Sequence, residues 1–448
     1  MSLKYFGTDG IRGEYGGPTL NDEIAFRAGV AVARLLKAQH ETDSPVMIVG
    51  RDTRDSGRKL LAALGAGFRS EGGVIESIGV APTPAIAKVV AVGEALAGCA
   101  ITASHNPSSD NGLKFFQREG TKPSEQFEFE LDREVGKAKT NGTMSFPELE
   151  DVFANKTEEY VSRVLGAFDS KFLSGKRIAL DCANGALSVV APRVFEALGA
   201  DIDVVGCAPD GLNINDGVGS ECPDSMTNMY SSGSYDMGFA FDGDGDRMVA
   251  FDQKGTKLRG EAVLGLLAIR FQETQALRED TLVTTLQSNL GLDSALSGKG
   301  IAVKRVGIGD KFVSRLMIAE NYSLGGEESG HVVIGDFSMT GDGLFAGLKV
   351  AQAACETGRS LEDLASFYKP FPQETRAIRV ATKIPLEDCL NISAATRELE
   401  ERLGDAGRLL VRYSGTEPKI RLLVEAKTID LATKAIGKLE AAVSDDLG

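Results

Sequence analysis

The chain has 448 residues, a length that predicts about three domains, or about four if they are small. Lys and Arg number 49 and Asp and Glu number 64, so the formal net charge is −15. A balance this acidic argues against nucleic acid or an anionic membrane as a partner. If the ligand is an anion, local clusters of positive charge must hold it.

The cysteines and the N-terminus favour a cytoplasmic protein. Six cysteines, at 99, 182, 207, 222, 355 and 389, form no C-x-x-C pair and no zinc-type spacing, which suits free thiols in a reducing compartment. Residues 1–10 contain no basic stretch followed by an apolar core, and no run of about 18 apolar residues occurs. We therefore expect no signal peptide and no membrane-spanning segment.

One supersecondary unit occurs three times along the chain. Each copy is a short apolar strand, a polar or glycine-containing loop, a helix, and a second strand that follows a glycine. The copies comprise strand 46–49, helix 60–68 and a strand from 74; strand 177–181, helix 189–198 and strand 201–205; and strand 282–285, a short helix before Gly298 and a strand from 301. This alternation predicts three α/β domains with mostly parallel sheets, whose ligand groups lie on loops at the carboxyl ends of strands.

The last part of the chain has a different order of elements, which predicts an α+β domain. After Pro372 we expect strands at 375–380, 409–411 and 420–425 and helices at 391–403 and from 430. Pro370 and Pro372 mark the clearest linker, and softer boundaries fall near Phe153 and Lys254. The predicted domains are therefore 1–153, 154–254, 255–369 and 370–448.

The motif FDGDGDR places Asp242, Asp244 and Asp246 directly after the apolar run 237–241. Three carboxylates so close repel one another unless a cation is present, and alternating oxygen ligands with glycines between them suit Mg²⁺. A solvated acidic loop is the alternative. An EF-hand is excluded, because its sixth position would be Arg247 and its twelfth Gln253.

The motif TASHNPSSDNGLK follows another apolar run, 97–101, so Ser104 lies where a strand ends and a turn-rich loop begins. This is a suitable place for a nucleophile or a phosphate carrier, although a serine in a turn more commonly caps local structure. His105 is adjacent in sequence and is more often a loop-packing residue than a base, and no G-x-S-x-G motif occurs. Lys114 shares the loop and could carry a proton or neutralise phosphate charge, or be a surface lysine.

The segment VRYSGTEPKIR near the C-terminus combines two guanidiniums with hydroxyls and a glycine. Its candidate phosphate ligands are Arg412, Ser414, Gly415, Thr416 and Arg421. Arginine forks match phosphate oxygens two at a time, and hydroxyl and backbone N–H groups satisfy the others. A charged turn between two strands is the alternative.

Three further segments have weaker signals. GTDGIRG at 7–13 presents Arg12 among glycines, and GIGDK at 307–311 follows a predicted strand. In GGEESGH at 325–331, Glu327 and Ser329 alternate and His331 follows a glycine, so a carboxylate and a hydroxyl could bind sugar hydroxyls or an amine. Each segment, taken alone, is also consistent with an ordinary turn.

Taken together and in this order, the segments resemble those of the α-D-phosphohexomutase superfamily over essentially the whole chain. The resemblance implies four domains around one central cleft, each of which supplies a loop: phosphoserine, metal, sugar recognition and phosphate binding. Ser104 would be the phosphoserine and would share one Mg²⁺ per site with Asp242, Asp244 and Asp246. Arg12, Lys114, Arg247 and His105 would serve the transferring phosphoryl group, with Lys114 as general acid/base.

The remaining residues would bind the substrate: Glu327, Ser329 and His331 the sugar, and Arg412, Ser414, Gly415, Thr416 and Arg421 the phosphate that does not react. The resemblance also implies a hexose bisphosphate as priming activator and a hexosamine phosphate as the small-molecule substrate. It is compatible with a homodimer. GTDGIRG and SGTEP are similar to the branch that interconverts glucosamine 6-phosphate and glucosamine 1-phosphate, a step toward UDP-N-acetylglucosamine and the cell wall.

Several positions depart from the pattern of that branch: Ser108 and Ser109 replace aromatic residues, Glu328 replaces glutamine, and Tyr413 replaces proline or lysine. Because Glu328 lies in the sugar loop, the alternative is a phosphomannomutase or phosphoglucomutase with the same mechanism. A phosphosugar-binding regulator on an inactive scaffold and a metal-dependent phosphatase are further alternatives.

Overall fold

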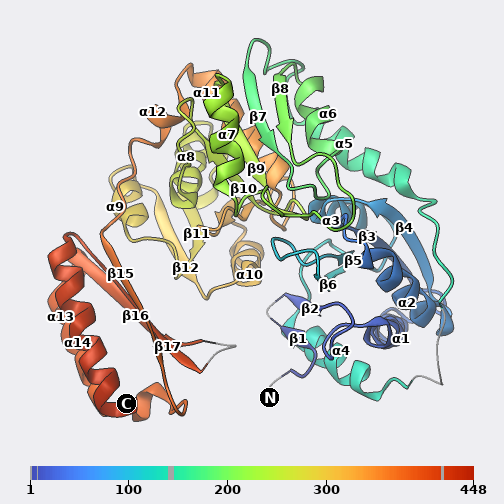
Figure 1. The fold of residues 1–448 in the computed structure, drawn as a ribbon, viewed down its shortest axis with the longest axis horizontal. Helices are drawn as coiled ribbons and strands as arrows, with labels where there is room; N and C mark the ends of the chain where they lie inside the picture. Colours follow the sequence, from blue (N-terminus) through green and yellow to red (C-terminus); the bar gives the residue numbers. More distant parts are fainter. Residues whose placement is uncertain (1–2, 8, 140–145, 415–417, 448) are drawn as a thin grey trace. The chain divides into compact units, whose positions relative to one another are not determined.

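The computed structural model describes residues 3–7, 9–139, 146–414 and 418–447. The chain forms two compact units (Figure 1). Unit 1 comprises Met1–Gln287 and Ile301–Ser366, and unit 2 comprises Ser288–Gly300 and Phe367–Gly448. None of the described helices is both long and apolar enough to cross a membrane.

Unit 1 contains three β-sheets with helices between their strands. Its strands are β1 (Phe6–Gly7), β2 (Gly10–Glu14), β3 (Val46–Arg51), β4 (Val74–Val80), β5 (Ala97–Ile101), β6 (Asp110–Gln117), β7 (Arg177–Asp181), β8 (Asp201–Val205), β9 (Met237–Phe241), β10 (Met248–Phe251), β11 (Thr281–Thr285), β12 (Ala302–Val306), β13 (Leu324–Gly326) and β14 (Val332–Ile334). Its helices are α1 (Asp22–His40), α2 (Ser56–Ser70), α3 (Thr83–Val92), α4 (Glu125–Lys137), α5 (Thr157–Gly166), α6 (Val190–Ala197), α7 (Pro223–Ser232), α8 (Gly260–Glu273), α10 (Asp310–Glu320), α11 (Gly343–Thr357) and α12 (Leu361–Ala365), with short 3₁₀ turns η1 (Ala154–Lys156) and η2 (Arg278–Asp280).

The three sheets share one topology. In each, two parallel strands flank the first strand, and a fourth strand joins the third as an antiparallel hairpin, giving the orders β6-β5-β3-β4, β10-β9-β7-β8 and β14-β13-β11-β12. The first sheet is extended by β2 and β1 beyond β6. The three α/β copies predicted from the sequence are confirmed, and the antiparallel fourth strand is an addition to them.

This shared topology places three of the predicted motifs at equivalent positions. The turn between the third and fourth strands carries Ser104 in the first sheet, Asp244 in the second and Glu327 in the third. Each turn begins at the carboxyl end of a parallel strand, which is where α/β sheets bind ligands.

Helices cover both faces of the first sheet, which explains its continuous apolar strands. Along β3, Met47 and Val49 pack into a core cluster with residues of α1 and α2. Ile48, between them, packs on the other face against Ile86 and Val90 of α3. Because successive strand residues point to opposite faces, both faces need apolar side chains here.

The second and third sheets share a helix. Residues of α11 contact β9 and β10 in the second sheet and β14 in the third. The side chain of Asp342 caps the start of α11 by accepting a hydrogen bond from the Phe345 N–H at 2.9 Å, and the buried Tyr160 hydroxyl also donates to it at 3.0 Å.

Unit 2 contains the α+β fold that the sequence predicts after Pro372, together with the segment Ser288–Gly300. Its elements are α9 (Gly291–Ser297), β15 (Gln373–Arg379), η3 (Leu386–Asp388), α13 (Leu390–Leu403), η4 (Gly404–Ala406), β16 (Gly407–Tyr413), β17 (Lys419–Ala426) and α14 (Ile429–Leu447). The strands form an antiparallel sheet in the order β15-β17-β16, and α13 and α14 cover it through a core that includes Leu399, Leu422 and Leu439.

The short helix of the third α/β copy, α9, groups with unit 2. The Leu290 N–H donates to the buried Glu425 carboxylate at 2.8 Å, and the Asn289 side chain donates to the Phe371 carbonyl at 3.1 Å. These polar contacts tie the segment Ser288–Gly300 to β17 and to the start of the C-terminal part, and nothing in the strand-helix pattern of the sequence indicated them.

Candidate active site

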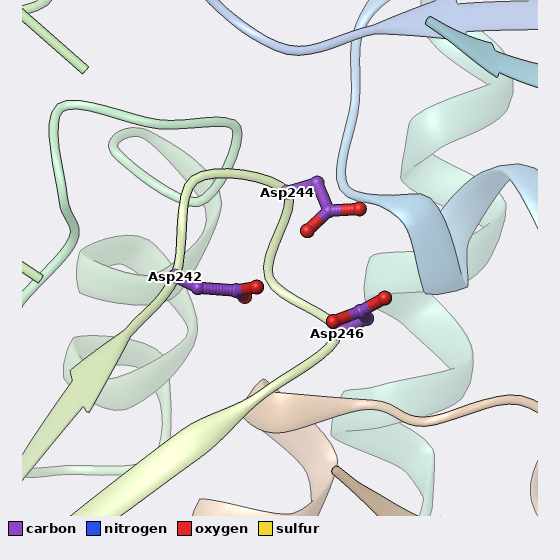
Figure 2. Close-up of side chains that lie close together, drawn as sticks. All are labelled: Asp242, Asp244 and Asp246. Carbon is purple, nitrogen blue, oxygen red and sulfur yellow. The ribbon is translucent and has the colours of Figure 1, made fainter. Parts of the chain in front are cut away.

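Three buried aspartates form a compact cluster at the end of β9. Asp242, Asp244 and Asp246 are at most 3% exposed, and one oxygen from each lies within 4.8 Å of the others. Figure 2 shows the three carboxylates close together around the turn that follows β9. The solvated acidic loop considered from the sequence does not describe side chains this deeply buried.

The hydrogen bonds around the cluster leave one oxygen unpartnered on each of two aspartates. Asp244 Oδ2 accepts from the Thr83 hydroxyl at 2.7 Å and from Lys114 Nζ at 2.8 Å, but Asp244 Oδ1 has no hydrogen-bond partner. Asp246 Oδ1 is buried and also lacks a hydrogen bond, with His331 Nδ1 at 3.7 Å and Arg247 Nε at 3.9 Å as longer contacts. Unsatisfied buried carboxylate oxygens are costly, and a small hard cation would satisfy both. The residues therefore fit a divalent metal ion.

The protonation of the cluster reflects the same concentration of charge. Burial and the neighbouring Asp244 and Asp246 raise the pKa of Asp242 well above its usual value. Burial acts in the same direction on Asp246, but Lys114 and His331 outweigh it and hold the Asp246 pKa well below its usual range. We call the turn of residues 242–247 the metal loop. Its carboxylates thus depend on positive charge from Lys114 and His331 outside this loop and from Arg247 within it.

Ser104 occupies a constrained turn and contacts this cluster. Its hydroxyl donates to Asp242 Oδ2 at 2.6 Å, and its side chain is 1% exposed. The Ser104 φ is +55°, in the left-handed region that costs a non-glycine residue about 1 kcal/mol or more. The Ser104 N–H donates to Thr102 Oγ1 at 2.9 Å, which helps to hold this conformation.

Arg54 holds the rest of the serine loop, and sequence reasoning missed it. Its buried guanidinium donates to the carbonyl oxygens of Ser104 at 2.9 Å and Asn106 at 2.8 Å, and also to those of Pro107 and Asp110. Asp52 neutralises Arg54 at 2.9 Å with both side chains fully buried. Arg54 lies at the carboxyl end of β3, in the loop of the first α/β copy, and that position was the one signal available for it.

Lys114 lies between the metal loop and Asp9. Its Nζ is 2.8 Å from Asp244 Oδ2, 3.0 Å from Asp246 Oδ2 and 3.2 Å from Asp9 Oδ2. Burial alone would lower the Lys114 pKa, but Asp244, Asp246 and Asp9 overcome that effect and raise it well above its usual value. Lys114 is therefore a charged, nearly inaccessible ammonium and not the surface lysine that was one alternative.

Arg247, His105 and Arg12 add positive charge and orientation. Arg247 Nη1 is 3.2 Å from His105 Nδ1, and His105 Nδ1 is 3.5 Å from the Ser104 hydroxyl. Burial and Arg247 lower the His105 pKa, so its neutral ring accepts from Arg247 and orients it. Arg12 contacts Asp9 at 3.8 Å, and its charge adds to burial and Arg247 in lowering the His105 pKa.

The sugar loop predicted in the third sheet lies against the metal loop. Residue 331 forms an isolated β-bridge with Arg247, and Glu327 Oε1 accepts from the Gly309 N–H at 3.1 Å. The Ser329 hydroxyl is buried and has no hydrogen-bond partner, which suits a group that a ligand would satisfy. His331 is 2% exposed and lies between Asp246 and Asp310, behind the aspartate cluster.

In unit 2, Arg412 of β16 and Arg421 of β17 are directly paired across the two strands. Burial and Arg421 lower the Arg412 pKa. Like charges opposite one another destabilise a sheet, and a phosphate between two guanidiniums would relieve that repulsion. Ser414 is buried nearby, and its carbonyl accepts from Lys383 Nζ at 2.5 Å. The predicted ligands Gly415 and Thr416 lie outside the described residues.

Further polar groups of the site gave little or no signal in the sequence. Thr83 begins α3, and both its N–H and its hydroxyl donate to Asp244. Asn215 donates to the Ser104 and Asn106 carbonyls. Asp9 stands in the GTDGIRG segment, where only Arg12 attracted attention.

Four family models match consecutive parts of the chain. They describe phosphoglucomutase/phosphomannomutase alpha/beta/alpha domain I at residues 3–142, domain II at 158–255, domain III at 259–371 and the C-terminal domain at 373–439. The order and number of these domains agree with the four predicted from the sequence, whose boundaries stay predictions.

Individual relatives match over nearly their full length. The chain is 40% identical over 451 residues to a phosphoglucosamine mutase of Leuconostoc citreum, covering 99% of this chain and 98% of the relative. The fold of this chain is similar to that of a phosphoglucomutase/phosphomannomutase family protein from Burkholderia thailandensis, with a TM-score of 0.81 and 22% identity. The match covers 100% of this chain and 98% of that one.

A second solved structure is Aspergillus fumigatus N-acetylphosphoglucosamine mutase in complex with GlcNAc-6P and magnesium. It matches with a TM-score of 0.68 and 17% identity, over 100% of this chain and 96% of that one. The protein is therefore a mutase: the chain belongs to the α-D-phosphohexomutase superfamily and groups with its phosphoglucosamine mutases.

Proposed function

We propose that the protein interconverts glucosamine 6-phosphate and glucosamine 1-phosphate through phosphorylated Ser104 and a bisphosphorylated sugar. The observation that carries this proposal is the 2.6 Å hydrogen bond between the Ser104 hydroxyl and Asp242 in a buried carboxylate cluster. It puts a strained, inaccessible serine beside a site fitted for a divalent cation. Phosphoryl transfer requires this combination of positioning and charge neutralisation.

In the first half of the cycle, the phosphoryl group moves from Ser104 to the free hydroxyl of the sugar. The bond from phosphorus to the Ser104 oxygen breaks, and a bond to the sugar oxygen forms. The sugar hydroxyl loses a proton and the Ser104 oxygen gains one. We assign this exchange to the Lys114 ammonium, which gives its proton to the leaving Ser104 oxygen and takes the proton of the sugar hydroxyl in its place, held by three carboxylates.

In the second half, the bisphosphate turns around and Ser104 takes the other phosphoryl group. Arg247 and Arg12 neutralise the transferring group in our proposal, with His105 orienting Arg247 through the 3.2 Å contact. Glu327 and Ser329 bind sugar substituents, and Arg412 and Arg421 bind the phosphate that is not reacting. His331 supports Asp246 from behind, because it lies 3.7 Å from that carboxylate and is 2% exposed.

The cation that we propose for the aspartate cluster is Mg²⁺, with a hexose bisphosphate as the activator that first phosphorylates Ser104. When bound, the ion would neutralise charge on the transferring phosphoryl group. All of its protein ligands are oxygens, which is the set that Mg²⁺ prefers. The magnesium in the Aspergillus fumigatus structure supports this choice.

We place the protein in the cytoplasm, since its six cysteines are free and thiols stay reduced there. A homodimer remains a proposal that sedimentation would test.

Replacement of the serine nucleophile tests the mechanism. We expect Ser104→Ala to lower turnover by about 10⁴-fold or more, because the phosphate carrier is removed, and to carry no phosphate by intact mass after priming with glucose 1,6-bisphosphate. Ser109→Ala, on the exposed side of the same loop, should keep wild-type activity. Normal turnover in Ser104→Ala would refute the scheme, and free phosphate released faster than isomer would indicate a phosphatase.

Metal binding can be measured without activity. Adding Mg²⁺ to chelator-treated protein should raise the melting temperature by about 2 °C or more, since a ligand of the folded state stabilises it. Asp244→Asn should abolish this rise: the amide oxygen can keep the bonds from Thr83 and Lys114, while the amide nitrogen replaces the unpartnered oxygen. Asp216→Asn, at an exposed position, is the matched control. A full Mg²⁺ response in Asp244→Asn would contradict the assigned site.

The choice of sugar requires parallel assays. We expect kcat/KM for glucosamine 6-phosphate to exceed the values for glucose 6-phosphate and mannose 6-phosphate by about tenfold or more, since an amine and a carboxylate form a charge-assisted pair. Initial rates with Mg²⁺ and the matching bisphosphate primer would show this. A higher value for glucose or mannose 6-phosphate would make the protein a phosphoglucomutase or phosphomannomutase.

Glu328, the unusual residue of the sugar loop, should make stability depend on pH. Burial is the main cause that raises its pKa to about 7 from 4.5. Because the folded chain binds this proton more tightly than the unfolded chain, the fold loses stability as pH rises from about 4.5 to about 7. Glu328→Gln removes this loss and should raise the melting temperature at pH about 8 by about 1–3 °C, with a smaller gain near pH about 5.

Thermal melts of the two proteins at both pH values would measure this difference. Glu159→Gln, on the exposed face of α5, should show no such dependence. An equal change in melting temperature at both pH values would mean that Glu328 does not carry the effect.

A further inference from the structure

Six ionisable side chains form a closed ring beside the metal loop, in which each contacts the next. The ring runs Lys114 to Asp9 (3.2 Å), Asp9 to Lys122 (2.5 Å), Lys122 to Asp310 (3.0 Å), Asp310 to His331 (3.5 Å), His331 to Asp246 (3.7 Å), and Asp246 back to Lys114 (3.0 Å). Basic and acidic groups alternate around it. We call this set the charge ring.

The charge ring joins parts of the chain that are far apart in sequence. Asp9 precedes β2, Lys114 lies on β6, and Lys122 follows β6, all in the first sheet region. Asp246 belongs to the turn after β9, and Asp310 begins α10. The ring therefore connects segments of all three sheets in unit 1, and two of its carboxylates, Asp9 and Asp246, contact the Lys114 ammonium that we assign to proton transfer.

Lys122 has a distinct place in this ring. Its side chain is 5% exposed, and its Nζ contacts Asp9 on one side and Asp310 on the other. Among the described residues, none of the three metal-loop aspartates lies within ion-pair distance of it. Phe116 lies beneath the ammonium, with its ring centre 5.6 Å away. Lys122 thus contacts the charged groups of the site through its two carboxylate partners, while the more distant Lys114 and Asp246 act on it only through space.

The two partners depend on Lys122 in different ways. The Asp9 carboxylate also contacts two other cations, Lys114 at 3.2 Å and Arg12 at 3.8 Å. Without Lys122 it could rotate away from Lys114 toward Arg12. Asp310 has His331 Nε2 at 3.5 Å, but that nitrogen accepts a hydrogen bond from the Gly341 N–H at 3.0 Å and so has no proton to donate to Asp310. Without the Lys122 ammonium, two largely buried carboxylates would lose the charge between them, and their repulsion would move Asp9 away from its present position.

We propose that Lys122 is a positioning residue for phosphoryl transfer, which fixes Asp9 against Lys114 and so holds the Lys114 ammonium on Asp244 and Asp246. The inference rests on the proposed role of Lys114. A displacement of about 1 Å in a catalytic group is enough to lower turnover by about 10²-fold. Lys122 contacts neither Ser104 nor the sugar loop, so substrate binding should change little.

A purely structural role for Lys122 can be separated from this one. The same two segments, residues 122–128 and α10, are also joined by Lys311 to Glu128 at 3.0 Å and by Arg315 to Glu125 at 2.9 Å. Arg315 also donates to the Pro123 carbonyl at 2.9 Å and is outside the charge ring. Arg315→Met therefore removes one cation from the same contact and is the matched control for Lys122→Met.

The test compares Lys122→Met, Lys122→Arg and Arg315→Met in the full-length protein with glucosamine 6-phosphate, Mg²⁺ and primer. We expect Lys122→Met to lower kcat by about 10- to 100-fold, with KM within about twofold of the wild-type value. Lys122→Arg should recover most of kcat because it restores the charge, and Arg315→Met should match the wild type. Melting temperatures show whether each variant is folded.

A double-mutant cycle with Asp9→Asn tests the route through Asp9. If Lys122 acts by holding Asp9, the double variant Asp9→Asn with Lys122→Met should be no slower than the slower single variant. Fully additive losses, a wild-type kcat in Lys122→Met, or equal losses in Lys122→Met and Arg315→Met would each overturn the proposal. An inactive wild-type protein would refute the mutase function itself, so the two failures are distinguishable.

Discussion

Confinement of negative charge in a dry interior is the constraint on which the site depends. Three carboxylates at the end of β9 are nearly inaccessible to water and lie close enough to share one ion. Such a group is stable only if cations surround it. Lys114 supplies charge from the first sheet and Arg247 from the metal loop itself, so an acidic protein gathers several of its buried bases in one place.

The repeated topology explains how distant segments reach this place. In all three sheets the functional turn joins the third parallel strand to the antiparallel fourth, and the framework of each sheet is built from apolar strands that the sequence shows clearly. The strand of residues 177–181 and the strand of residues 201–205 were predicted with the bounds that the structure has. Strand 177–181 is recognisable because burial on both faces demands a continuous apolar run. Strand 201–205 is a partly exposed edge strand, and the glycine at 199 marks its beginning instead.

The parts of the site that escaped prediction are those defined by contacts between distant residues. Ser104, Lys114 and the three aspartates stand in motifs whose composition is unusual. Arg54 and Lys122 stand in ordinary polar sequence, and their importance arises only when folding brings Arg54 under the serine loop and Lys122 between Asp9 and Asp310. The grouping of α9 with unit 2 rests on Glu425, more than a hundred positions away, and has the same cause.

The hairpin position of each functional turn has a consequence for how such proteins diverge. A turn that connects two adjacent antiparallel strands can change in length or sequence without altering the order of the sheet beneath it. The serine and aspartate turns are bound to each other by hydrogen bonds, so they can vary only together. The third turn is joined to the end of the metal loop and the start of β10 through residue 331 and Gly330, whereas the Glu327 carboxylate accepts from Gly309 in its own sheet region. New sugar preferences can therefore arise in the third sheet while the chemistry inherited in the first two stays intact.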